Sequence, residues 1–282
     1  HAYQSWRWAR KYNAWWLWWL EYQLNRLVLS KLLALAVGLA CLFFAFKYNK
    51  NALFETSDST YGTYWKLVST EYIPDSLIQS IKQELNRIDF VASNYKPTSE
   101  LSIINAAPIN TEIAISSDMY TILKFAEDLH QLSNGYYDVT IGSLIIKEGF
   151  GPESSMVDNA IPVSKKRFNF LNNNSITKND NFQFDLSSIA KGYALDSISN
   201  LLMKANRNNY LIDIGGEIIV NGSKHGEPWT VGIQSPSAVN NQSDTQIRSN
   251  KFLAIATSGE YRNFKLNDNG VVTSHTFIPE IQ

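Results

Sequence analysis

The fold class follows most directly from one stretch of the chain, Asp185-Leu186-Ser187-Ser188-Ile189-Ala190-Lys191-Gly192-Tyr193-Ala194-Leu195-Asp196. A helix is predicted to follow Lys191-Gly192, because apolar residues then recur at helical spacing as far as Leu202. Short strands are predicted after that helix at residues 210–214, 218–220 and 229–233. Helices and strands mixed without regular strand-helix-strand repetition indicate an α+β fold with a mixed sheet.

The region before this stretch contains two further helical patterns. One follows Pro74, where Asp75 is expected to cap a helix whose apolar face includes Ile81 and Leu85. The second is expected to begin at a cap on Ser116 or Ser117 and to stop at Asn134-Gly135. The asparagine-rich stretch 169–181 and the polar run 235–250 are predicted to be surface excursions.

The N-terminal fifty residues differ in composition from the rest. Residues 27–46 are apolar except for Ser30 and Lys31, which is long enough to span a bilayer. The flank before them carries an excess of basic residues, so the positive-inside rule favours a cytoplasmic N-terminus. We therefore expect a Trp-rich lead and membrane helix in residues 1–50 and a folded domain in residues 51–282. A cleaved signal peptide is the alternative.

Composition excludes several classes of protein. The 282 residues carry 25 basic and 26 acidic side chains, a net charge of −1, and no basic run in the soluble part. A binder of nucleic acid phosphates needs a basic surplus, so we expect no nucleic acid partner. One cysteine, Cys41, and four histidines exclude a disulfide framework and a His/Cys zinc cluster of the usual spacing. Any metal here would need oxygen ligands.

Several unusual segments follow one another in a fixed order along the chain. They are Gly62-Thr63-Tyr64-Trp65, Ser93-Asn94-Tyr95-Lys96-Pro97, Ser99-Glu100-Leu101-Ser102, Gly135-Tyr136-Tyr137-Asp138-Val139-Thr140-Ile141-Gly142, the 185–196 stretch, Asp213-Ile214-Gly215-Gly216-Glu217, Pro228-Trp229, Ala256-Thr257-Ser258-Gly259-Glu260-Tyr261-Arg262-Asn263 and Ser274-His275. This series strongly resembles the ApbE-type FAD:protein FMN transferases. The resemblance covers nearly all of residues 60 to 278, which makes it far more specific than any one motif.

The resemblance implies an α+β domain of the ApbE-like flavin transferase type and a defined reaction. The enzyme would cleave FAD with Mg²⁺, join FMN through a phosphodiester bond to a threonine or serine of an acceptor protein, and release AMP. By analogy the acceptor would be an FMN-binding subunit of a membrane electron-transfer complex. With the predicted topology, the domain would be tethered to a bacterial inner membrane and would face the periplasm.

The resemblance also implies individual site residues. Tyr95 and the turn Tyr136-Tyr137-Asp138 match positions that hold FAD, as do Lys191 and Ser197. Without the resemblance, Tyr95 and Tyr137 would read as core aromatics, and Lys191 as a solvated lysine at a helix start. Asp213, Glu217, Ser258 and Arg262 match the family as well and are interpreted as structural support.

The resemblance is weaker at the metal and at the general base. It implies a Mg²⁺ ligand in the backbone carbonyl of Ala194, whereas the family's side-chain ligands belong to a later D-A-x-x-T segment that is absent before Gln282. His275 is the candidate general base or acid, because an imidazole with a pKa of ~6.5 suits that task. The family has an aspartate where this chain has Ile278.

Three functions remain open on the sequence. The first is a membrane-tethered FMN transferase whose C-terminal segment is missing from an incomplete sequence, as the start at His1 also suggests. The second is a truncated relative that binds FAD without transferring FMN. The third is an FAD pyrophosphatase that releases FMN and AMP, in which water replaces the acceptor hydroxyl.

Overall fold

The computed structural model describes residues 22–23, 25–45, 47, 52–152, 167–235, 243–259, 264–266 and 272–274. The chain divides into two units, 1–52 and 53–282. In the first unit, one helix of 21 residues, Asn25–Ala45, has the length and composition to cross a membrane, with none of it buried. A signal sequence would have the same length and composition.

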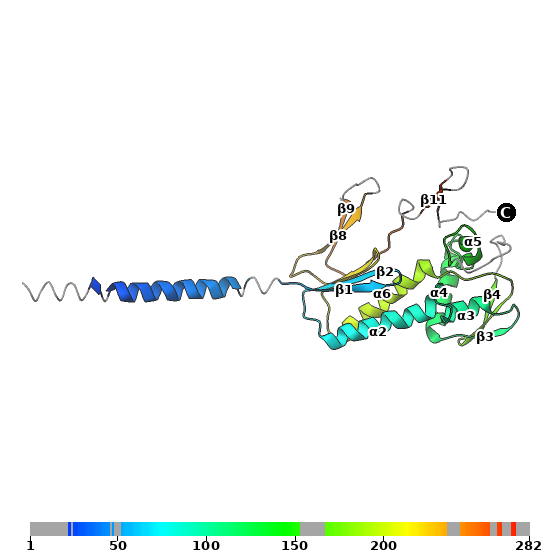
Figure 1. Ribbon diagram of the computed structural model, residues 1–282, viewed down its shortest axis with the longest axis horizontal. Coiled ribbons are helices and arrows are strands. Elements are labelled where there is room, and N and C mark those ends of the chain that lie inside the picture. Colours follow the sequence, from blue (N-terminus) through cyan, green and yellow to red (C-terminus); the bar gives the residue numbers. More distant parts are fainter. Residues whose placement is uncertain are drawn as a thin grey trace, which may run out of the picture. The chain divides into compact units, whose positions relative to one another are not determined.

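The second unit is built on a five-stranded antiparallel sheet with the strand order β1-β2-β6-β7-β10. Its strands are β1 (Phe54–Thr60), β2 (Thr63–Ser69), β6 (Tyr210–Ile214), β7 (Glu217–Asn221) and β10 (Leu253–Ile255). Helices α2 (Asp75–Ala92) and α6 (Ser187–Lys204) run side by side and pack on one face of this sheet (Figure 1). The ribbon of β8 (Trp229–Gln234) and β9 (Ser243–Ser249) packs through Trp229 and Val231 against the opposite face.

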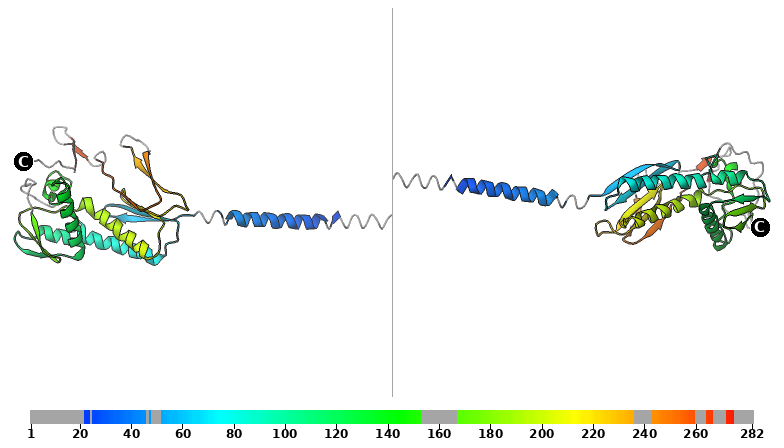
Figure 2. Two further views of the ribbon diagram at one scale, coloured as in Figure 1. Left: turned by 180° about the vertical axis from the view of Figure 1, so that it is seen from behind. Right: turned by 90° about the horizontal axis from the view of Figure 1, so that it is seen from below.

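A second core lies beside this sheet, where α3 (Glu100–Ala106), α4 (Ser117–Leu132) and α5 (Gly142–Lys147) gather near a smaller sheet (Figure 2). The smaller sheet has the strand order β3-β5-β4, formed by β3 (Glu112–Ala114), β4 (Phe168–Asn172) and β5 (Ser175–Lys178). The short strands β11 (Phe264–Leu266) and β12 (Val272–Ser274) pair with each other.

The predicted amphipathic helices are confirmed, with one change at a cap. In α2 the side chains of Ile81, Leu85 and Ile88 are buried. Asp75 is the first helical residue rather than the cap, which is Pro74. Its carboxylate therefore acts on the positive end of the helix dipole and not as a capping acceptor.

The second helix has the predicted ends. The Ser116 side chain accepts a hydrogen bond from the Met119 amide and so caps α4. After the helix, Asn134 and Gly135 adopt φ of 53° and 88°. This left-handed conformation is the one that favours asparagine and glycine, and it turns the chain towards Tyr136.

The helix after the 185–196 stretch begins earlier than predicted. It starts at Ser187 and not after Gly192, which lies inside the helix where a Cβ would meet nothing within 4 Å. An Asp185 side-chain oxygen accepts a hydrogen bond from the Ser187 amide at 2.8 Å, which satisfies one donor of the first turn. Lys191 consequently lies in the second turn of α6 and not at its N-terminus.

The prediction of a surface excursion was wrong for residues 169–181, whereas residues 245–250 of the second polar stretch are exposed or half-buried, as predicted for a surface segment. Residues 169–181 contain most of the β4–β5 hairpin, with Ile176 and Lys178 only 0% and 1% exposed. The Lys178 ammonium donates to the carbonyls of Asn105 and Ala107 at 2.8 and 3.1 Å. It thereby provides hydrogen-bond donors for carbonyls at the C-terminal end of α3. The second polar stretch contains β9, whose partner is β8.

Candidate functional site

Three segments implied to hold FAD meet near the start of α6. The hydroxyl of Tyr137 shares a hydrogen bond of 3.0 Å with the hydroxyl of Ser188, in the first turn of that helix. Tyr95 and Tyr136 are 67% and 56% exposed, so both rings are open to solvent. The Tyr95 hydroxyl donates to the carbonyl of Phe150 at 3.4 Å. The exposed rings offer flat apolar faces next to a half-buried phenol.

The turn that carries Tyr137 is fixed on both sides. The Tyr137 amide donates to the Ser133 hydroxyl at 2.8 Å, and His130 Nδ1 donates to the Tyr137 carbonyl at 2.8 Å. One Asp138 oxygen accepts from the amide and the hydroxyl of Thr140, both at 2.7 Å. Burial raises the pKa of Tyr137, so its hydroxyl stays protonated at neutral pH and remains available as a donor.

A cavity of about 170 Å³ opens beside these segments. Its wall includes the side chains of Asn94 and Asp185, which are joined by a hydrogen bond of 2.7 Å from the amide to the carboxylate. Asn94 directly precedes Tyr95, and Asp185 lies two residues before α6. The cavity is polar on this side, which suits a ligand with hydrogen-bonding groups.

Lys191 points to the turn between β6 and β7. Its ammonium lies 2.8 Å from a carboxylate oxygen of Glu217, and the two side chains are 30% and 19% exposed. The turn is held by Asp213, which accepts from the Gly216 amide at 2.8 Å and from the Tyr64 hydroxyl at 2.9 Å. Gly215 is required there, because its φ is 58° and an added Cβ would lie 2.7 Å from Thr63.

The residue pair Ser188–Lys191 fits a motif of serine acyl enzymes, and its geometry argues against that chemistry. Ser188 contacts the phenol of Tyr137, whereas Lys191 contacts the carboxylate of Glu217. A lysine base would have to contact the serine hydroxyl that it activates. Ser188 and Lys191 therefore do not form a nucleophile and its base.

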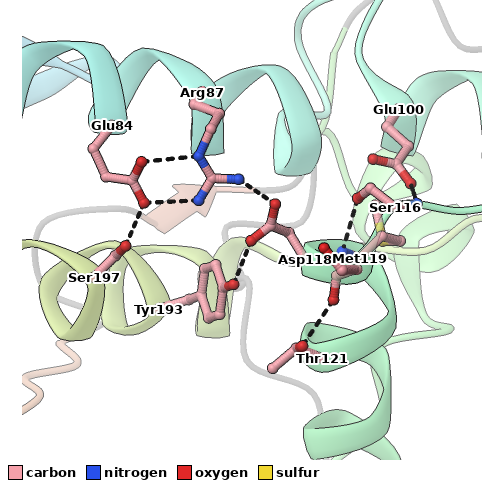
Figure 3. A network of polar contacts seen from close by, with 10 residues as sticks. Glu84, Arg87, Glu100, Ser116, Asp118, Met119, Thr121, Tyr193 and Ser197 are labelled. Atoms are coloured by element: carbon pink, nitrogen blue, oxygen red, sulfur yellow. Dashed lines mark hydrogen bonds and ion pairs between the residues drawn. The ribbon is translucent and has the colours of Figure 1, made fainter. Parts of the chain in front are cut away.

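Ser197 lies apart from this group of residues. Its hydroxyl donates to Glu84 of α2, within a network that also contains Arg87, Asp118 and Tyr193 (Figure 3). Ser197 lies six positions after Lys191, and at 3.6 residues per turn the two side chains leave α6 in different directions. The structure therefore does not bring Ser197 together with Lys191.

The network joins three helices through two carboxylates and one guanidinium. Arg87 donates to both oxygens of Glu84, at 2.8 and 2.7 Å, and also pairs with Asp118 at the start of α4. The Arg87 hydrogen bonds lower the pKa of Glu84, which keeps this carboxylate ionised. Burial, with the hydrogen bond to Asp118, raises the pKa of Tyr193 to about 12.

The described residues do not by themselves form the implied magnesium site. Ala194 is fully buried inside α6, where its carbonyl belongs to the hydrogen-bond ladder of the helix. Within the described ranges, no group of three or more His, Cys, Asp or Glu side chains could hold a metal. Mg²⁺ usually rests on one or two carboxylates besides phosphate, so this carbonyl alone does not fit the ion.

Two sequence candidates lie outside the described residues, His275 and Arg262. One contributor was undervalued by the sequence interpretation. The sequence assigns Glu217 to structural support, and the structure shows that it is the partner of the lysine implied to meet FAD. The sequence gives no sign that Lys191 and Glu217 pair, because they lie 26 positions apart.

Comparisons with known proteins agree in fold and family. The sequence profile of the ApbE family matches residues 61–281. A Vibrio cholerae relative named FAD:protein FMN transferase is 33% identical over 239 residues, which is 79% of this chain and 70% of that protein. A Haemophilus influenzae relative of the same name is 29% identical over 276 residues, covering 90% of this chain and 78% of its own length.

Solved structures are similar over most of the chain. The flavin transferase ApbE from Vibrio cholerae matches with a TM-score of 0.68 and 29% identity, over 81% of this chain and 76% of that one. The ApbE protein from Thermotoga maritima matches with a TM-score of 0.71 and 26% identity, over 81% and 77% of the two chains. These similarities confirm the predicted class of mixed helices and sheets.

Proposed function

Because the chain belongs to the ApbE family, we propose that it is an FAD:protein FMN transferase. The prediction of a transferase is confirmed by the names of its relatives. The match over residues 61–281 carries the proposal, since it contains every candidate binding residue. The contact between Tyr137 and Ser188 supports it, because this contact gathers two of the matched segments at one place.

The proposed reaction transfers a phosphoryl-linked flavin to a hydroxyl. The oxygen of an acceptor threonine or serine forms a bond to the FMN phosphorus of FAD. The bond from that phosphorus to the bridging oxygen breaks, and the bridging oxygen leaves with AMP. The hydroxyl proton passes to a base, for which we propose His275 on the family resemblance.

We assign binding roles to residues on either side of the α6 start. The exposed rings of Tyr95 and Tyr136 would stack against the isoalloxazine, and Tyr137 and Asp138 would hold its edge. The Lys191 ammonium would favour the negatively charged pyrophosphate. A direct contact from Ser197 would require its hydroxyl to leave Glu84.

Magnesium dependence is part of the proposal and rests on the family alone. The described residues offer the Ala194 carbonyl and no carboxylate cluster, so by themselves they would not hold the ion. We further propose that Asn25–Ala45 anchors the chain in a bacterial inner membrane. The domain would then face the periplasm and an acceptor such as an FMN-binding subunit of an electron-transfer complex.

The function is tested by incubating the full chain in detergent with FAD, Mg²⁺ and a threonine-bearing acceptor domain. Mass spectrometry should find FMN on the acceptor and one AMP released for each FMN attached. AMP without a labelled acceptor would instead identify an FAD pyrophosphatase. FAD binding without either product would identify a flavin-binding protein, and omission of Mg²⁺ tests the need for the ion.

A further inference from the structure

We propose that Asp185 is a positioning residue that ties the three FAD-binding segments together before FAD arrives. The assignment of these segments to FAD rests on the proposed function. The ties themselves are hydrogen bonds from one residue to three parts of the chain that are distant in sequence. None of the six implied FAD contacts is Asp185 itself.

The amide and the two carboxylate oxygens of Asp185 each form a hydrogen bond with a different segment. Its amide donates to the carbonyl of Val139 at 2.8 Å, directly after the Tyr136-Tyr137-Asp138 turn. One carboxylate oxygen accepts from the Asn94 side chain at 2.7 Å, directly before Tyr95. The other accepts from the Ser187 amide at 2.8 Å, next to the serine that contacts Tyr137.

The hydrogen bond between Asn94 and Asp185 is kept although it leaves the other polar atom of the Asn94 side chain without a partner among the described residues. An ionised carboxylate only accepts hydrogen bonds, so the Asn94 amide nitrogen must face Asp185. The Asn94 carbonyl oxygen is then buried without a hydrogen-bond partner among the described residues. A buried acceptor in that state is unfavourable, and an ordinary surface asparagine would turn to satisfy it.

The backbone beneath Asp185 is held rigidly from the other side. The Asn105 side chain accepts from the Phe184 amide at 2.7 Å and donates to the Phe184 carbonyl at 3.0 Å. The Asn105 carbonyl in turn accepts from the buried ammonium of Lys178. Asp185 therefore projects from a fixed point into the wall of the 170 Å³ cavity, where it sets the position of Asn94.

A simple helix cap would not have this set of contacts. Capping explains the bond to the Ser187 amide and nothing more. The bonds to Asn94 and Val139 reach residues 91 and 46 positions away in sequence, and both go to segments implied to hold FAD. Local capping predicts that loss of the Asp185 carboxylate loosens the start of α6 alone, whereas positioning predicts that the Asn94 segment loosens with it.

The test uses full-chain variants and measures amide hydrogen exchange without FAD, followed by FAD affinity from the quenching of flavin fluorescence. D185A should speed exchange at least tenfold in residues 93–95 and 187–190 together, because both lose a bond to the carboxylate, whereas the main-chain bond to Val139 is retained by alanine. It should also weaken FAD binding at least tenfold. N94D should act similarly, because it sets two carboxylates against each other at hydrogen-bonding distance. The swapped pair N94D/D185N restores one donor and one acceptor, and should recover FAD affinity to within threefold of the parent.

The matched control is D58A. Asp58 also accepts from a neighbouring amide and from a side chain, those of Ser59 and Lys82, and it lies on β1 outside the site. This variant should leave FAD affinity unchanged. Faster exchange confined to 187–190 in D185A, or a swap that binds FAD no better than N94D, would overturn the proposal. If D185A does not fold, the FAD affinity of N94D compared with that of N94D/D185N tests the proposal.

The failure of the proposed function is distinguishable from the failure of this inference. If the parent chain binds no FAD, the assignment of the site fails. The exchange pattern in D185A still establishes or removes the tie between the Asn94 segment and the start of α6, because it is measured without ligand.

Discussion

Two polar clusters leave opposite sides of α6, and they are built differently. The network around Arg87 joins α2, α4 and α6, and each of its charged groups has at least two polar partners. The Lys191–Glu217 pair consists of one contact on a rigid turn. An ammonium has three N–H donors, so Lys191 keeps donors for a ligand. The Arg87 network, in which every charged group has polar partners, holds helices together. The Lys191–Glu217 pair keeps N–H donors that a ligand can use.

The largest effect on stability should come from removing the cation of the Arg87 network. R87M leaves Glu84 and Asp118 ionised and without their shared partner, which should lower the free energy of unfolding by about 2 kcal/mol. Urea unfolding at pH 7 measures it. R207M is the control, because among the described residues the Arg207 side chain has one hydrogen-bond partner, the Tyr72 carbonyl, and its loss should cost well under half as much. Equal losses in the two variants would show that the network is not cooperative.

The next largest effect should appear at the Lys191–Glu217 pair, as a change in FAD affinity and not in stability. K191M removes the ammonium proposed to meet the pyrophosphate, so the Kd for FAD should rise about tenfold, equivalent to about 1.4 kcal/mol. Flavin fluorescence titration measures it. K204M, on the exposed last turn of the same helix, should bind FAD like the parent. An unchanged Kd in K191M would remove the contrast drawn between the clusters.

A smaller effect concerns pH. Because hydrogen bonds from Arg87 lower the pKa of Glu84 in the folded chain, its stabilising contribution is complete above the unfolded pKa of ~4.3. That contribution disappears as the pH falls from there through the lower folded pKa. We expect the parent to lose more stability than E84Q as the pH falls from 5 to 3, as measured by urea unfolding. Parallel pH profiles would assign the acid sensitivity elsewhere.

The smallest change sharpens the assignment of Ser197. S197A removes one hydrogen bond to Glu84, so unfolding should become easier by about 0.5–1 kcal/mol while the Kd for FAD stays within twofold. Both are measured on the same preparation. S80A, which removes an exposed bond within α2, is the control. A weakened FAD affinity with unchanged stability would instead place Ser197 in direct contact with the flavin.

Local patterns predicted the elements that local forces determine. Strand Tyr210–Ile214 has the predicted ends, because its residues alternate between the two faces of the sheet. Helix α4 has the predicted ends as well, because Ser116 and Asn134 meet backbone demands within a few residues. The start of α6 was missed because the Asp185 carboxylate accepts from the Ser187 amide and supports an earlier start, whereas Gly192 reads as a boundary.

The rest depended on contacts between distant residues. The β4–β5 hairpin was hidden by its asparagines, although Phe168 and Ile176 reach the core from it. Arg87 and Asp118 lie 31 residues apart, and no spacing rule connects them. The site was predicted only as a series of family segments, since the bonds of Asp185 to Asn94 and Val139 exist only in the folded chain.

Burial of one lysine makes the protein its own reference for chemical labelling. Lys178 is 1% exposed, and burial lowers the pKa of its ammonium, whereas the Lys191 side chain is 30% exposed. An amine-acetylating reagent should therefore modify Lys191 in the folded chain and leave Lys178 untouched until the chain opens. Mass spectrometry of the two peptides from one sample then separates protection by a ligand from loss of native structure.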